Sequence, residues 1–178
     1  ASRWSYTSRM KRVAELLNEM LQARVVLDYA VFGAVAQMRY TEAVATLDAD
    51  ILVKVAHPEA LDVLAPPYAF CRERGYEPEG EAIRVGDWPV QLIPAFDPLT
   101  EAAMREAETA DFEGVPLRVV RADYLACIAL SVGRPKDHAR VLALRESGAV
   151  TDEQVSKLVE QYGLTDRWRS FRKRFDEE

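Results

Sequence analysis

The feature that most restricts the fold is an aliphatic run that two acids directly precede. Residues 47–55 read Leu-Asp-Ala-Asp-Ile-Leu-Val-Lys-Val. A continuous apolar run of this kind, rich in β-branched residues, is typical of a strand buried on both faces. Asp48 and Asp50 stand two positions apart at its start, so their side chains would lie on one face of the strand, about 7 Å apart.

Hydrophobic spacing and turn residues place the other elements. We expect helices over 8–24, with Ser8 as N-cap, and over 34–40, 67–75 and 97–110, and strands over 29–32, 82–85, 88–93 and 117–120. Four helices follow over 124–132, 135–146, 151–163 and 165–175, and Thr151 with Gln154 forms a capping box for the third. The sequence therefore predicts a mixed α/β (α+β) unit, residues 1–120, followed by a helical C-terminal unit, residues 121–178.

Composition and charge narrow the class of protein. The 178 residues are 49% apolar and carry a net charge of −6, which argues against a generally cationic binder of nucleic acid or membrane surfaces. Residues 121–178 alone carry 11 Lys/Arg against 10 Asp/Glu, so this part could meet an anionic partner.

Cys71 and Cys127 belong to no Cys/His cluster. No apolar run approaches 18 residues and the N-terminus lacks a signal core, so we expect a cytoplasmic protein without a membrane span.

The candidate chemistry lies where a glycine bend and the two acids would meet. Gly33 separates a β-prone run, Tyr29–Phe32, from a helical stretch, and a glycine before a helix lets backbone N–H groups approach phosphate. Two carboxylates on one strand face can share Mg²⁺, which prefers one or two carboxylates together with substrate phosphates. These parts together describe a site for metal-assisted nucleotidyl transfer.

The order Gly33, helix, Thr46-x-Asp48-x-Asp50 and apolar strand resembles the DNA polymerase β-like nucleotidyltransferase superfamily. The run Gly133-Arg-Pro-Lys-Asp137, with helices after it, is similar to the single-domain bacterial branch related to abortive-infection-type toxins. The resemblance implies a nucleotidyltransferase-fold mixed sheet with a C-terminal helical bundle. It also implies a nucleoside triphosphate with Mg²⁺ or Mn²⁺, an RNA, protein or small-molecule hydroxyl as acceptor, and a cognate antitoxin as a partner.

The same resemblance suggests a role for each candidate residue. The acids Asp48 and Asp50 would hold the metal, and Gly33, Ala34 and Thr46 would bind the nucleotide. Arg134 and Lys136, at the start of a later helix, would neutralise phosphate charge. Gln91 stands where the family has its third carboxylate, and it would join the two aspartates at the catalytic position.

Three positions depart from the family pattern and keep other interpretations open. Ala34 lacks the hydroxyl of the usual Gly-Ser pair, Val44 replaces an arginine, and Gln91 cannot act as an anionic base. The chain could therefore bind a nucleotide or a partner without turnover, as a toxin–antitoxin component, or be a structural interaction module in which the acids are incidental.

The basic C-terminal helix has a structural and a functional interpretation. Leu164, Trp168, Phe171 and Phe175 share one helix face, so we expect the aromatic residues to belong to the core. The cations would then form the exposed face, either solvated or in contact with a polynucleotide. His57 and His138 fit no ligand pattern, and we expect both on the surface.

Overall fold

The computed structural model of the chain describes residues 3–42, 44–46 and 48–176. It contains one mixed sheet of seven strands in the order β3-β4-β5-β2-β1-β7-β6. The strands are β1 Val26–Phe32, β2 Ala49–Val55, β3 Pro78–Glu79, β4 Ala82–Val85, β5 Trp88–Pro94, β6 Glu108–Phe112 and β7 Val115–Val119. The helices are α1 Arg3–Gln22, α2 Gly33–Gln37, α3 Ala65–Glu73, α4 Pro98–Arg105, α5 Ala122–Val132, α6 Pro135–Glu146, α7 Asp152–Gln161 and α8 Thr165–Phe175.

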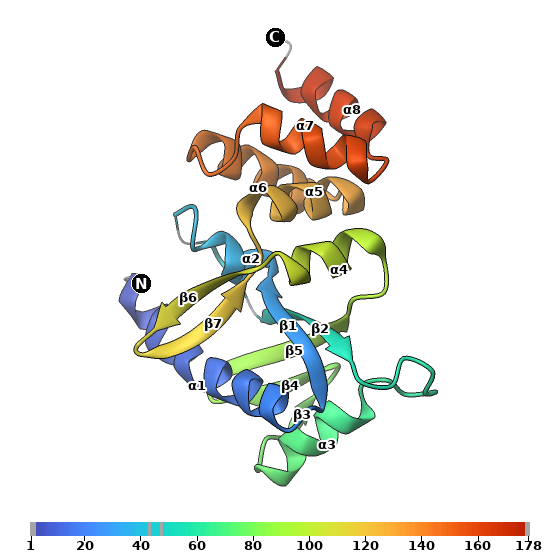
Figure 1. Cartoon of the computed structure of the whole chain (residues 1–178). Helices are drawn as coiled ribbons and strands as arrows, with labels where there is room; N and C mark the ends of the chain where they lie inside the picture. Colours follow the sequence, from blue (N-terminus) through green and yellow to red (C-terminus); the bar gives the residue numbers. More distant parts are fainter. Residues whose placement is uncertain (1–2, 43, 47, 177–178) are drawn as a thin grey trace.

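The aliphatic run forms β2 near the centre of the sheet, as its composition predicts. This strand pairs antiparallel with β1 and parallel with β5. Ile51, Leu52 and Val53 are all buried. Helix α1 lies along one side of the sheet, and α2 and α4 pack against the central strands β1 and β2, towards the C-terminal helices (Figure 1). Leu47, where we expected the strand to begin, lies outside the described residues.

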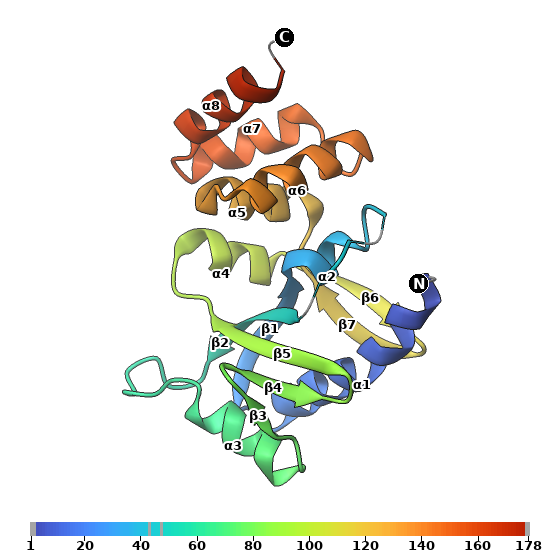
Figure 2. The same ribbon diagram turned by 180° about the vertical axis from the view of Figure 1, so that it is seen from behind.

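Helices α5 to α8 pack on one another beyond α2 and α4, as both views show (Figures 1 and 2). Their core includes Trp168 and Phe171, so the structural interpretation of the aromatic stripe on α8 is confirmed. Trp168 Nε1 donates to Ser156 Oγ of α7 at 3.1 Å. The predicted capping box is also present, since Gln154 N donates to Thr151 Oγ1 at 3.2 Å and Thr151 N donates to Gln154 Oε1 at 2.9 Å.

Several predicted element bounds were wrong. The helix expected to reach Ala110 ends at Arg105, and 108–112 form strand β6 against β7. The turn between these strands uses Glu113 and Gly114, both with positive φ, instead of the usual Asn-Gly or Asp-Gly pair. The first helix begins at Arg3, so Ser8 lies inside it and is no cap. Helix α2 spans five residues only, and strand β3 was not predicted.

No helix in the described part of the chain combines the length and apolarity needed to cross a bilayer.

Candidate functional site

Asp50 and Gly33 are in direct contact where β1 leads into α2. Gly33 has a φ of +66°, in the left-handed region that favours glycine. A Cβ placed on Gly33 would lie only 2.6 Å from Asp50 Oδ2. The missing side chain is therefore what allows the half-buried Asp50 carboxylate to approach the start of α2.

Replacing Gly33 with alanine should affect both stability and ligand binding. We expect a loss of about 1–2 kcal/mol in the free energy of unfolding from the positive φ alone. The new methyl group would also displace the Asp50 carboxylate, which should weaken ligand binding. Urea denaturation and nucleotide titration measure the two effects.

Gly75→Ala is the matched control for this variant. Gly75 also has a positive φ, of +80°, but nothing lies within 4 Å of a Cβ placed there. A Gly33→Ala variant no less stable than Gly75→Ala, with unchanged nucleotide binding, would contradict the role given to this contact.

Asp48 and Thr46 lie in the segment that leads into β2. The Thr46 hydroxyl donates to the Asp48 backbone carbonyl at 2.8 Å, which fixes the turn before the strand. Asp48 is partly exposed and close enough to Asp50 to raise its pKa. The two acids predicted to act together are therefore neighbours.

Gln91 lies beside Asp50 on the adjacent parallel strand. The two residues are register partners of β5 and β2, so their side chains share one face of the sheet. Gln91 Nε2 donates to Glu81 Oε2 at 3.4 Å. Because an ionised carboxylate only accepts hydrogen bonds, this contact leaves the Gln91 carbonyl oxygen as the atom available to a cation.

Helix α6 brings positive charge to the Asp50 side of the fold. Arg140 Nε donates to Gln37 Oε1 of α2 at 3.0 Å, and its Nη1 lies 3.6 Å from Asp137 Oδ1. Asp137 is only 1% exposed. Burial raises the pKa of Asp137, but hydrogen bonds from Arg134 and the charges of Arg134 and Arg140 more than offset this, so its pKa is lowered overall. This buried carboxylate holds the arginines in place.

The charges around Asp50 oppose one another. Burial raises the pKa of Asp50, the carboxylate of Asp48 raises it further, and the positive charges of Arg140, Lys136 and Arg134 lower it, with a net rise. An acid that is costly to ionise beside a second acid is suited to a cation, because a cation removes the repulsion between them.

These elements enclose a pocket of about 580 Å³. It is lined by Ala34, Gln37, Val44, Ala45, Thr46, Asp50, Lys136, Ala139, Arg140 and Ala143. The predicted residues Ala34, Thr46, Asp50 and Lys136 therefore share one cavity, with Gly33 in contact with Asp50. Arg134 points its guanidinium to Asp137, with Nε 2.7 Å from Oδ2, and it does not line the pocket.

Arg140 and Gln37 belong to the pocket but were not predicted. Arg140 follows Lys136 by four residues and so falls on the same face of α6, which was the signal in the sequence. Gln37 lies one turn after Gly33 on α2. Only the packing of α6 against α2 makes the two residues partners, and the sequence does not show that packing.

The donors at this site are of the kind that Mg²⁺ takes. Asp48 and Asp50 offer carboxylate oxygens and Gln91 offers an amide oxygen, all hard ligands. No group of three or more His, Cys, Asp or Glu suited to a metal occurs in the described part of the chain. The donor set therefore fits a magnesium ion that phosphate oxygens also coordinate, and Mn²⁺ by the same chemistry.

Comparison with solved structures identifies the fold. The solution structure of the antibiotic-resistance factor ANT(2'')-Ia is similar over 98% of this chain and 97% of that one, with a TM-score of 0.53 and 14% identity. A crystal structure of an antigenic nucleotidyltransferase-like protein from Paracoccidioides brasiliensis is similar over 91% and 93%, with a TM-score of 0.55 and 13% identity. No family model and no curated sequence matches the chain. The chain thus has a nucleotidyltransferase fold, as predicted, and likeness at this identity shows the fold alone.

Proposed function

We propose that the chain binds a nucleoside triphosphate with Mg²⁺ or Mn²⁺ and transfers its nucleotidyl group to an acceptor hydroxyl. The observation that carries this proposal is the contact of the Asp50 carboxylate with Gly33, opposite the cations of α6. Asp50, an acid for a metal, and Lys136 and Arg140, cations for phosphate, then border one pocket. The nucleotidyltransferase fold of the two structural relatives supports the same reaction class.

Each residue has a defined part in this proposal. Asp48 and Asp50 would hold the metal, with the carbonyl oxygen of Gln91 beside them. A metal held there would supply Lewis-acid chemistry to the triphosphate. Lys136 and Arg140 would offset the negative charge that pyrophosphate carries as it leaves. Gly33 and Ala34 would present backbone amides to phosphate, as in the family that the sequence resembles.

Binding without turnover is the second candidate, and Gln91 favours it. An amide cannot take the proton of the attacking hydroxyl, so a site with two carboxylates could bind nucleotide but transfer it slowly or not at all. In that case the chain would act through a partner protein, such as a cognate antitoxin. The two candidates differ in turnover, so one experiment distinguishes them.

The test uses each of the four nucleoside triphosphates, labelled in the nucleotidyl group, with Mg²⁺ or Mn²⁺, and offers total RNA and a protein extract as acceptors. We expect label to appear in one acceptor fraction, and to be lost without the metal or when either Asp48 or Asp50 is replaced. The control for removing one acid is Glu160→Gln, at an exposed position of α7 away from the pocket. Nucleotide binding without label transfer would support the second candidate, and absence of nucleotide binding would refute both.

A further inference from the structure

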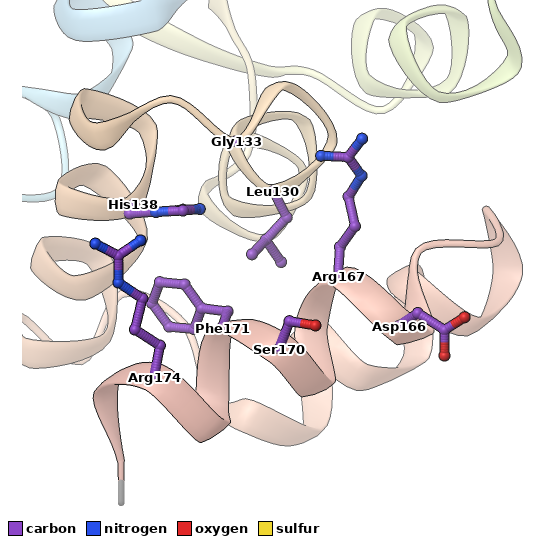
Figure 3. A pocket seen from close by; sticks show the side chains of 8 residues that line it. All are labelled: Leu130, Gly133, His138, Asp166, Arg167, Ser170, Phe171 and Arg174. Carbon is purple, nitrogen blue, oxygen red and sulfur yellow. The ribbon is translucent and has the colours of Figure 1, made fainter.

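A second pocket lies in the helical part of the chain and has no role in the proposal above. It measures about 380 Å³ and lies between the end of α5, α6 and α8 (Figure 3). Its lining is Leu130, Gly133, His138, Asp166, Arg167, Ser170, Phe171 and Arg174. Three of these side chains carry or can carry a positive charge.

Two of the basic groups converge on the α5–α6 connection. A Cβ placed on Gly133 would lie 3.0 Å from Arg167 Nη1 and 3.9 Å from His138 Nε2. Gly133 ends α5 in the left-handed conformation, so its bare Cα lets both groups approach. His138 is half-buried and lies edge-on to Phe171 and Phe175, with ring centroids 5.7 Å apart in each pair. The surface position expected for His138 from the sequence is therefore only partly correct.

The arginines of this pocket differ from the others on α8 in having no acidic partner among residues 3–42, 44–46 and 48–176. Arg169 pairs with Asp166 at 2.9 Å and Arg172 pairs with Asp176 at 3.0 Å. Within the described ranges, no carboxylate lies within ion-pair distance of Arg167 or Arg174. Figure 3 shows the Asp166 carboxylate pointing away from the pocket while Arg167 extends towards Gly133. The cavity therefore presents uncompensated positive charge.

This second pocket and the candidate catalytic pocket lie on opposite sides of α6. Lys136 and Arg140 line the catalytic pocket, whereas His138, between them in sequence, lines the other. Gly133, just before α6, also borders the second pocket. A helix is about 10–12 Å across, so a small anion cannot touch both pockets, whereas a polymer passing around the start of α6 can.

We propose that this second pocket binds phosphates of a single-stranded polynucleotide, whose end then reaches the catalytic pocket as the acceptor. Only the acceptor role rests on the proposed function. Cations border both pockets, Arg167 and Arg174 at the second and Lys136 and Arg140 at the catalytic one. A polynucleotide carries one charge on every nucleotide and can meet both sets, whereas a protein with a single phosphate would meet only one of them.

The binding should not depend on base sequence. Phe171 is the one aromatic carbocycle in the pocket lining, and it is buried against Trp168, with ring centroids 5.6 Å apart. It has no free face on which a base could stack. Contacts to phosphate alone position a polynucleotide without reading its sequence.

The test measures binding of labelled oligouridylate and oligoadenylate of about 12 nucleotides over a range of salt concentrations, without metal or nucleotide. We expect both to bind. The double variant Arg167→Gln/Arg174→Gln should weaken binding roughly tenfold at low salt, and should reduce the slope of log K against log[salt] by about 1.4, or ~0.7 for each lost phosphate contact. Because both arginines are exposed, we expect the variant to fold normally, which thermal melting checks.

The control variant Lys157→Gln/Lys173→Gln removes the same charge from exposed positions outside the pocket and should change affinity about twofold or less. Equal weakening by both double variants, or no binding by the unmodified chain, would overturn the proposal. Preference for a phosphoserine peptide or inorganic phosphate over the oligonucleotides would also overturn it. The binding assay contains neither metal nor nucleoside triphosphate, so a failure of nucleotidyl transfer would leave its result independent.

Discussion

Replacing Asp50 with asparagine should abolish nucleotidyl transfer and at the same time stabilise the protein. We expect the transfer rate to fall at least ~100-fold, because a carboxylate that holds the metal is lost while the shape of the side chain is kept. We expect the melting temperature at neutral pH to rise by about 2–4 °C. The gain arises because burial and the neighbouring Asp48 make the ionised Asp50 carboxylate unfavourable in the folded chain.

The sign of the pH dependence follows from the raised pKa of Asp50. The folded chain holds a proton on this group more tightly than the unfolded chain does. The stability that the protonated form contributes is therefore fully present below the ordinary pKa of an aspartate and is lost as the pH rises through the raised value. The advantage of Asp50→Asn should thus vanish below about pH 4 and grow as the pH rises through the raised value.

Thermal melts between acid and neutral pH, paired with the transfer assay, check this expectation. Glu160→Gln serves as control, since it removes one acid from an exposed position and should alter neither stability nor transfer. Added Mg²⁺ with nucleotide should raise the melting temperature of the unmodified chain but not that of Asp50→Asn. If Asp50→Asn melts earlier than the unmodified chain at neutral pH, the carboxylate has a stabilising partner and the site proposed for it is wrong.

The sequence predicted those parts of the fold in which a local pattern and tertiary packing agree. The aliphatic run from Ile51 is apolar enough to require cover on both faces, and it forms a central strand. The helices after residue 121 lie close to the positions expected, because an apolar run, Pro135 and the capping box of Thr151 mark three of them in the sequence. Strand β6 was missed because Glu108–Phe112 is half polar and its turn, Glu113-Gly114, is an uncommon pair.

The sequence predicted the pocket residues that belong to the motif, and it predicted Lys136 through the family resemblance. Gly33 and Asp50 were identified because the motif spaces them, and their contact follows from the pairing of β1 with β2. Arg140 was missed because its place beside Gln37 depends on how α6 packs on α2. The Glu81–Gln91 hydrogen bond was missed for the same reason, since it links the β3–β4 turn to β5.

Gln91→Asp should have the second large effect, on metal affinity and on stability, and it would remove the Gln91–Glu81 hydrogen bond. A carboxylate at position 91 would stand in register with Asp50 on the neighbouring strand. The superfamily that the sequence resembles has its third acid at this position. We expect the affinity for Mg²⁺ with nucleotide to rise about tenfold, because a third hard anionic ligand joins the donor set. Without metal, the added repulsion should lower the melting temperature by a few degrees.

Glu81 allows a sharper version of this experiment. Gln91 Nε2 donates to Glu81, and a carboxylate at position 91 could not. In the single variant the new carboxylate therefore faces two acids, Glu81 and Asp50. Changing Glu81→Gln as well restores a donor there. The double variant should therefore keep the gain in metal affinity and recover much of the lost stability.

Calorimetric titration of Mg²⁺ with a non-hydrolysable nucleotide, and melts with and without metal, measure both effects. Gln91→Asn is the control, because it shortens the side chain without adding charge and should not gain metal affinity. If transfer also rises in Gln91→Asp, the missing acid is what limits turnover; if only binding rises, the chain binds nucleotide without turnover. No change in metal affinity would mean that position 91 does not face the metal, because a new negative charge beside Asp50 must attract a cation bound there.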